Sequence, residues 1–178
     1  MAVVPPAASS AAAQSASSAD GAATPEAVAT EFNTAVRAGD FQAAARLMAP
    51  EALALARRFV QTLAERDPSG QFLRQVTGAQ SMDALAKLSD AEVFADFLRT
   101  QTAAQPGLTG AMKGATMRTL GHVNEGPDIA HVVYRTTMTI NGSTLSKVDV
   151  LTVRRSGGRW RALLPSELEG SIRAMLGG

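Results

Sequence analysis

The sequence predicts an α+β domain in which N-terminal helices pack on a curved four-stranded antiparallel sheet and a further helix follows the sheet. Apolar residues recur at helical spacing over 24–103, and the period changes to two from Thr116 onward. Asn141-Gly142, a pair that favours the tightest hairpin turns, separates two such alternating segments. Helices that come first and strands that come later are typical of α+β proteins.

Residues 1–23 differ in composition from the rest of the chain. They are rich in Ala, Ser and Pro and have no helical or strand periodicity, so we expect a disordered leader. Small residues suit cleavage by a signal peptidase, but a basic start and a full apolar stretch are missing. The leader indicates either the remnant of a signal, and hence a periplasmic or secreted protein, or a linker in a cytoplasmic one. We favour export.

Residues 24–178 are expected to form one domain, with a helical half over 24–103. Capping residues place the helix boundaries, because they satisfy the free backbone groups at helix ends. The expected signals are Thr24-Pro25 and Gly39 for the first helix, Asp40 for the second, Ala49-Pro50 for the third, Asp67-Pro68 and Ser81 for two weaker helices, and the capping box of Ser89 and Glu92 for the last. The segment 103–115 contains Pro106 and three glycines and is expected to be a loop.

The second half predicts a meander over 116–164. Its expected strands are 116–124, 129–140, 143–155 and 159–164, and the intervening residues carry turn signals. Residues 166–176 show apolar residues at helical spacing and predict a C-terminal helix.

Composition excludes several classes of protein. The 17 basic and 16 acidic residues give a net charge of +1, which is too balanced for a dedicated nucleic-acid binder. The absence of cysteine excludes a cysteine nucleophile, a disulfide and a thiolate metal site. No stretch is apolar enough to predict a transmembrane segment. No phosphate-binding glycine loop or zinc motif is present, so we expect no cofactor.

Two segments carry a resemblance to a known family. They read EFNTAVRAGDFQAAARLM over 31–48 and GGRWRALLP over 157–165. Together with the meander, they resemble the nuclear-transport-factor-2-like superfamily, which includes ketosteroid isomerase-like proteins. The resemblance covers about 24–164 and implies a cone, in which a curved sheet wraps against helices and encloses a pocket at its open end. Whether Phe32, Phe59, Phe94 and Phe97 line this pocket or fill it stays open.

The Asn141-Gly142 turn fixes the register of the strands on either side of it. With these two residues as the loop, Met138 lies opposite Leu145, Thr136 opposite Lys147, Tyr134 opposite Asp149 and Val132 opposite Leu151. This face is mostly apolar, so we expect it to look toward the helices. The candidate ligand-binding residues are Tyr134, Thr136, Met138, Lys147, Asp149, Leu151 and Trp160.

The leading functional hypothesis is a non-catalytic module that binds a small apolar ligand or a protein partner. The alternative is an isomerase, dehydratase or cyclase-type enzyme, which is the chemistry that the resemblance implies. In that case Asp149, with a pKa raised by apolar surroundings, would act as the base and Tyr134 as a hydrogen-bond donor. A structural explanation is that Asp149 is satisfied by the Tyr134 hydroxyl or by Lys147, and we favour it.

The two histidines, His122 and His131, would lie opposite each other on the outer face if the 124–128 turn is symmetric. With Glu125 and Asp128 they could hold a divalent metal, although we favour solvated surface histidines and expect no metal.

Two further groups have open interpretations. Trp160 is expected to anchor the last strand, with a pocket wall as the other option. The arginines around the last turn are expected to form a solvated rim, with an anionic partner as the alternative; they are Arg154, Arg155, Arg159 and Arg161. The outer sheet face is a candidate homodimer surface because apolar residues lie there, namely Leu120, Val133, Val148 and Val150.

Overall fold

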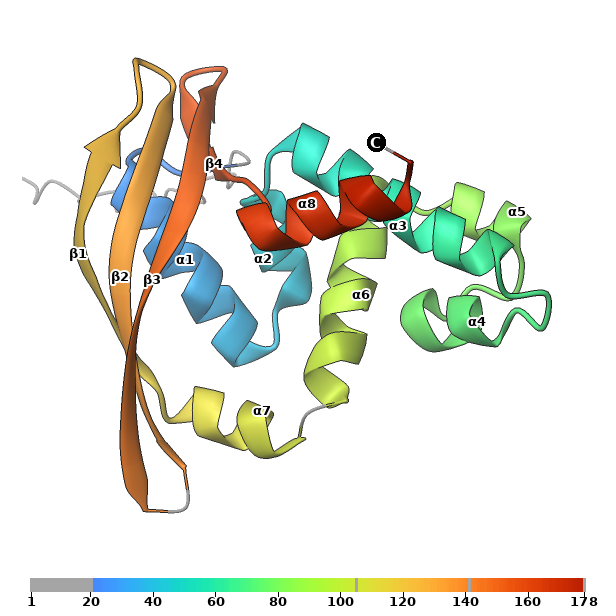
Figure 1. The fold of residues 1–178 in the computed structure, drawn as a ribbon, viewed down its shortest axis with the longest axis horizontal. Coiled ribbons are helices and arrows are strands. Elements are labelled where there is room, and N and C mark those ends of the chain that lie inside the picture. Colours follow the sequence, from blue (N-terminus) through green and yellow to red (C-terminus); the bar gives the residue numbers. More distant parts are fainter. Residues whose placement is uncertain (1–20, 105, 141, 178) are drawn as a thin grey trace, which may run out of the picture.

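The computed structural model describes residues 21–104, 106–140 and 142–177. The chain folds as an α+β protein, with helices first, a four-stranded antiparallel sheet next and a helix last (Figure 1). The elements are α1 (Pro25–Ala38), α2 (Phe41–Arg46), α3 (Pro50–Glu65), α4 (Gln71–Thr77), α5 (Met82–Ala86), α6 (Asp90–Ala103), α7 (Pro106–Lys113), β1 (Thr116–Asn124), β2 (Ile129–Ile140), β3 (Ser143–Ser156), β4 (Arg159–Ala162) and α8 (Ser166–Met175). No helix in the described ranges is long and apolar enough to cross a membrane.

The helices of the described part lie on one side of the sheet (Figure 1). Helix α1 packs directly on the strands, α2 and α6 follow behind it, and α4 and α5 lie farthest from the sheet. The sheet therefore has one face against helices and one face without them, as the alternating pattern of the strands predicts.

Most capping residues act as the sequence predicts, but Asp67-Pro68 does not start a helix, because α4 begins at Gln71 after Gly70. The Thr24 hydroxyl accepts a hydrogen bond from the Ala27 N–H (3.2 Å), and Gly39 ends α1 with a left-handed φ of 74°. Asp40 caps α2 through the Ala43 N–H (2.9 Å). The domain begins slightly earlier than predicted, because Ala22 is buried and exchanges two 2.8 Å backbone hydrogen bonds with Trp160. The rest of the predicted leader, residues 1–20, lies outside the described residues.

The strands follow the order β1-β2-β3-β4. Across β2 and β3, Tyr134 lies opposite Asp149 and Thr136 opposite Lys147, which confirms the predicted register. Gly142 has a positive φ of 77°, as the predicted turn requires, whereas Asn141 lies outside the described residues. Strand β4 ends at Ala162, two residues before the predicted end.

A bulge in β1, between Thr119 and Gly121, shifts the pairing with β2 by one residue. On the turn side of this bulge, Asn124 lies opposite Ala130, so His122 lies opposite Val132 and faces the helices, whereas His131 lies opposite Val123. The prediction that the two histidines face each other is wrong, because it required a symmetric turn, and this turn places Asn124 opposite Ala130 and not opposite Ile129.

The prediction of a loop over 103–115 is also wrong, since α7 occupies Pro106–Lys113. Proline at the first position of a helix is favourable, and α7 contacts α6, α1 and β2. These tertiary contacts outweigh the low helix propensity of the glycines. The presence of α7 is important for the candidate functional site described below, because this helix forms one of its walls.

The interior has two clusters of buried residues. The larger one joins the sheet to α1, α2, α3 and α6, and Val28, Val132 and Val153 in it are fully buried. The smaller one lies between α3, α4, α5 and α6 around Leu85 and Val93. Both clusters pack on α6, which is therefore held from two sides.

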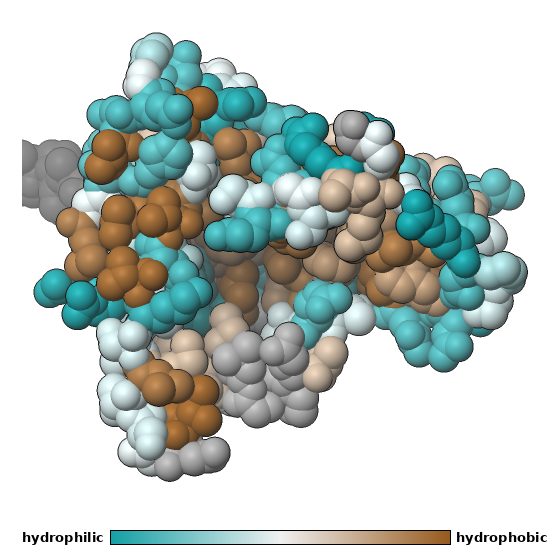
Figure 2. All heavy atoms as spheres, in the orientation of Figure 1, coloured by the Kyte–Doolittle hydropathy of each residue, from teal (hydrophilic) through white to brown (hydrophobic). Residues whose placement is uncertain are grey.

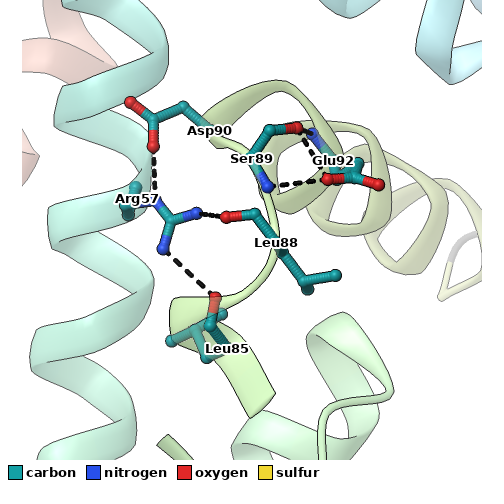
Figure 3. Close-up of polar contacts among 6 residues, drawn as sticks. All are labelled: Arg57, Leu85, Leu88, Ser89, Asp90 and Glu92. Carbon is teal, nitrogen blue, oxygen red and sulfur yellow. Dashed lines mark hydrogen bonds and ion pairs between the residues drawn. The ribbon is translucent and has the colours of Figure 1, made fainter. Parts of the chain in front are cut away.

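Arg57 of α3 holds the start of α6 in place (Figure 3). Its guanidinium pairs with Asp90 and donates hydrogen bonds to the carbonyl oxygens of Leu88 and, at 3.3 Å, Leu85. The capping box of Ser89 and Glu92 forms as predicted beside this contact.

Candidate functional site

A cavity of about 250 Å³ lies between α1, α7 and the strands β1 to β3. Five of the predicted site residues line it, namely Tyr134, Thr136, Met138, Lys147 and Asp149. Met112 of α7 and Met117 of β1 add to its apolar wall, and we call it the methionine cavity. The strand register explains this grouping, because alternate residues of paired strands share one face.

A second cavity of about 250 Å³ adjoins the first, and we call it the phenylalanine cavity. Phe32, Phe94 and Phe97 line it, and so does Leu151 of the predicted site. Phe59 lies behind Phe97 in an edge-to-face contact, with ring centroids 6.1 Å apart. Three of the four phenylalanines thus line a cavity, and Asn33 and Tyr134 line both cavities.

Tyr134 is half-buried at the boundary between the two cavities. Burial raises its pKa, and the negative charge of Asp149 raises it further, so the hydroxyl stays protonated at neutral pH. This hydroxyl has no hydrogen-bond partner among the residues that the structure describes. It is therefore available to donate a hydrogen bond to a molecule in either cavity.

Asp149 pairs with Lys147, whose ammonium nitrogen lies 2.6 Å from a carboxylate oxygen. The hydrogen bond to Asp149 raises the pKa of Lys147. Of the partners considered from the sequence, Lys147 and not the Tyr134 hydroxyl holds the carboxylate. The cavity wall thus carries an ion pair in place of an isolated acid.

Trp160 lies apart from both cavities. It is 9% exposed, belongs to the larger core cluster and pairs through its backbone with Ala22. This placement agrees with the expected anchoring of β4 and gives the side chain no wall of the methionine or phenylalanine cavity.

The histidines have separate partners. His122 pairs with Glu26 of α1, and this hydrogen bond lowers the pKa of Glu26. The Nε2 atom of His131 lies 2.8 Å from Glu125. Within the described ranges no group of three potential ligands could hold a metal ion.

The arginines around the β3–β4 turn have separate partners, although Arg154 and Arg161 lie opposite each other across the two strands. Arg154 pairs with Glu51 of α3 at 2.8 Å, and Arg159 donates a hydrogen bond to the Gly21 carbonyl at 2.7 Å. Arg155 is exposed. These separate roles favour the solvated rim over a binding site for an anion.

The outer face of the sheet carries exposed apolar side chains. Leu120, Val123, Val148 and Val150 are among the large hydrophobic residues that solvent reaches, and Figure 2 shows apolar residues gathered over the sheet. Figure 1 shows no labelled helix on this face. An apolar patch of this kind is typical of a surface that associates with another protein.

A scan of the chain against protein-family models found no match. Searches of curated proteins and of solved structures also found none.

Proposed function

We propose that this chain is a non-catalytic module, a cone of the nuclear-transport-factor-2-like kind, that binds a small apolar ligand. The observation that carries the proposal is the pair of adjoining cavities on the helix side of the sheet. Sites for small molecules are concave and mostly apolar, with a few polar groups that orient the ligand. The methionine and phenylalanine cavities have this character, since Asn33, Tyr134 and the Lys147–Asp149 pair stand among apolar walls.

The arrangement of helices over one face of a twisted sheet also supports a cone. Helix α1 covers the strands along the core, and α7 reaches β2 beyond it. The methionine cavity lies where these two helices meet the sheet.

The ion pair at Asp149 favours binding over catalysis. A general base must have a free lone pair within reach of its substrate, and here Lys147 pairs with one of the two carboxylate oxygens of Asp149. Tyr134, protonated at neutral pH, can orient a ligand by donating a hydrogen bond. The isomerase, dehydratase or cyclase-type enzyme based on Asp149 and Tyr134 remains the alternative, and turnover of a bound ligand that Asp149→Asn abolishes would favour it.

Binding of a neutral solvatochromic dye to the wild type and to two matched variants would test whether the methionine cavity holds a ligand. Thr136→Phe fills the methionine cavity, whereas Thr137→Phe adds the same ring on the opposite face of β2. We expect the first variant to weaken dye binding at least about tenfold, which corresponds to about 1.4 kcal/mol, and the second to leave it unchanged. Absence of dye binding, or equal binding by both variants, would contradict the proposal.

The exposed outer sheet face supports a second proposal, namely that two copies of the chain associate through it. Val148 and Val150 are 47% and 56% exposed, and they lie on a part of β3 that pairs with β2 but not with β4. Burial of such residues against a second copy would remove apolar surface from water.

A further inference from the structure

Arg37 lies in the last turn of α1, four residues after Asn33 and on the same side of the helix. It lines the methionine cavity together with Asn33. It also lines a third cavity, of about 300 Å³, between α1, α6 and α7, which Met112, Lys113 and Arg99 share. We call this the basic cavity. Arg37 thus forms part of the wall between the methionine cavity and the basic cavity.

The guanidinium of Arg37 has few hydrogen-bond partners within the described chain. A guanidinium has five N–H donors. Within the described chain, Arg37 has one hydrogen bond, from Nη2 to the Lys113 carbonyl oxygen at 3.4 Å, which is long for this type of bond. Its Nε is buried and has no partner there. A buried donor without a partner is unfavourable, and the two Nη groups have one long hydrogen bond between them, so an acceptor from a ligand at the Nη groups would stabilise this side chain.

Four other arginines differ from Arg37 in this respect. They each pair with a carboxylate of the chain: Arg57 with Asp90, Arg99 with Asp96, Arg154 with Glu51 and Arg173 with Glu169. No described carboxylate pairs with Arg37.

Basic residues surround Arg37. Lys113 and Arg99 line the basic cavity with it, and Lys147 lines the methionine cavity. Arg99 pairs with Asp96 and Lys147 with Asp149, which is the one acid among the described residues that line these two cavities. An anion would therefore find a complementary charge at Arg37 that the chain itself does not neutralise.

We infer that the ligand is an amphipathic carboxylate whose carboxylate group pairs with Arg37 and whose apolar part lies in the methionine cavity. This inference rests on the proposed function and specifies its ligand. The planar fork of an arginine matches a carboxylate with two parallel hydrogen bonds. The C-terminal ends of α1 and α7 carry partial negative charge beside Arg37, which opposes a phosphate dianion more than a monoanion.

The apolar part of such a molecule fits the remaining walls. Met112, Met117 and Met138 supply flexible thioether side chains, which adapt to the shape of a bound chain. Beyond them, Tyr134 and Asn33 mark the boundary with the phenylalanine cavity, which extends the apolar path. Because the site has Arg37 at one end and aromatic walls at the other, it would bind such a ligand in one orientation.

The test compares octanoate with octanol, which share an alkyl chain and differ in charge, by calorimetric titration of the full chain. We expect the wild type to bind octanoate at least about tenfold more tightly than octanol, as for a hydrogen bond to a charged group. Arg37→Gln is expected to remove this preference and to leave octanol binding unchanged. Arg37→Lys, which keeps the charge and loses the fork, should retain part of the preference. Arg118→Gln removes the same charge from an exposed position of β1 and should change nothing.

The outcomes separate this inference from the proposed function. If both probes bind equally to the wild type, or if Arg37→Gln keeps the preference, the inference is overturned and the cavity function stands. If Arg37→Gln abolishes the binding of both octanoate and octanol, Arg37 has a structural role and the inference also fails. If neither probe nor the neutral dye binds the wild type, the proposed function is overturned with it.

Discussion

Replacing Arg57 with alanine is expected to destabilise the protein and to loosen α6, which carries Phe94 and Phe97 of the phenylalanine cavity. The Arg57 side chain is 14% exposed, and it joins α3 to the segment before α6 through three contacts (Figure 3). Hydrogen bonds to a charged group contribute about 1.5–3 kcal/mol each. The ion pair adds about 1 kcal/mol or less, because the Asp90 side chain is 42% exposed.

From these contributions we expect Arg57→Ala to lower the free energy of unfolding by about 3 kcal/mol, which is toward the lower end of their sum. The reason is that the Leu85 carbonyl keeps a hydrogen bond from the Leu88 N–H (3.1 Å) when Arg57 is removed. For a chain of this size, about 3 kcal/mol corresponds to a fall in melting temperature of about 6–12 °C.

Urea denaturation followed by circular dichroism measures this change. Arg58→Ala provides the control, because Arg58 is the next residue on α3 and is exposed, so its loss should stay within about 0.5 kcal/mol. If Arg57→Ala is no more destabilising than Arg58→Ala, water replaces the guanidinium at no cost, and the argument that it holds α6 is refuted.

Three further predictions concern the site, the helix–sheet contact and the outer face. Tyr134, the single tyrosine, should titrate above 10 in near-ultraviolet absorbance, and Asp149→Asn should lower its pKa by removing a negative charge; an unchanged midpoint would contradict this. The pKa of Glu26 is lowered from 4.5 by its hydrogen bond with His122, so its contribution to stability is present above about pH 4.5 and is lost as the pH falls through the lowered pKa. Glu26→Gln should therefore flatten the acid side of the urea midpoint against pH, and parallel curves for the two proteins would refute the argument. Val148→Asp should shift the sedimentation coefficient toward that of a monomer and should remove the dependence of the unfolding midpoint on protein concentration, whereas an unchanged coefficient would contradict association through the sheet.

The fold and the hairpin register could be predicted because local rules determine them. A two-residue turn fixes which residues face each other, and the alternation of strand residues assigns them to one side of the sheet. The sequence therefore predicts that Tyr134 lies opposite Asp149, and the structure confirms this pairing.

The wall at Arg37 could not be predicted, because it depends on contacts between distant segments. In the sequence, Arg37 is an ordinary basic residue in the last turn of a helix, where it would complement the helix dipole. Its cavities require α7, whose glycines indicate a loop and whose helix depends on contacts with α6, α1 and β2. The partner of Asp149 could not be predicted for a similar reason. The strand register places both Tyr134 and Lys147 near the Asp149 carboxylate, and only the side-chain geometry shows that Lys147 pairs with it.

Native mass spectrometry of the full chain, purified gently from its source without added lipid, tests the ligand-binding account most directly. The account predicts a species heavier than the chain by one small molecule, which is released on denaturation and detected as a negative ion of a carboxylic acid. Arg37→Gln, purified in the same way, should retain less of it. The mass of the chain alone, combined with failure of octanoate to add to it at increasing concentration, would contradict the account.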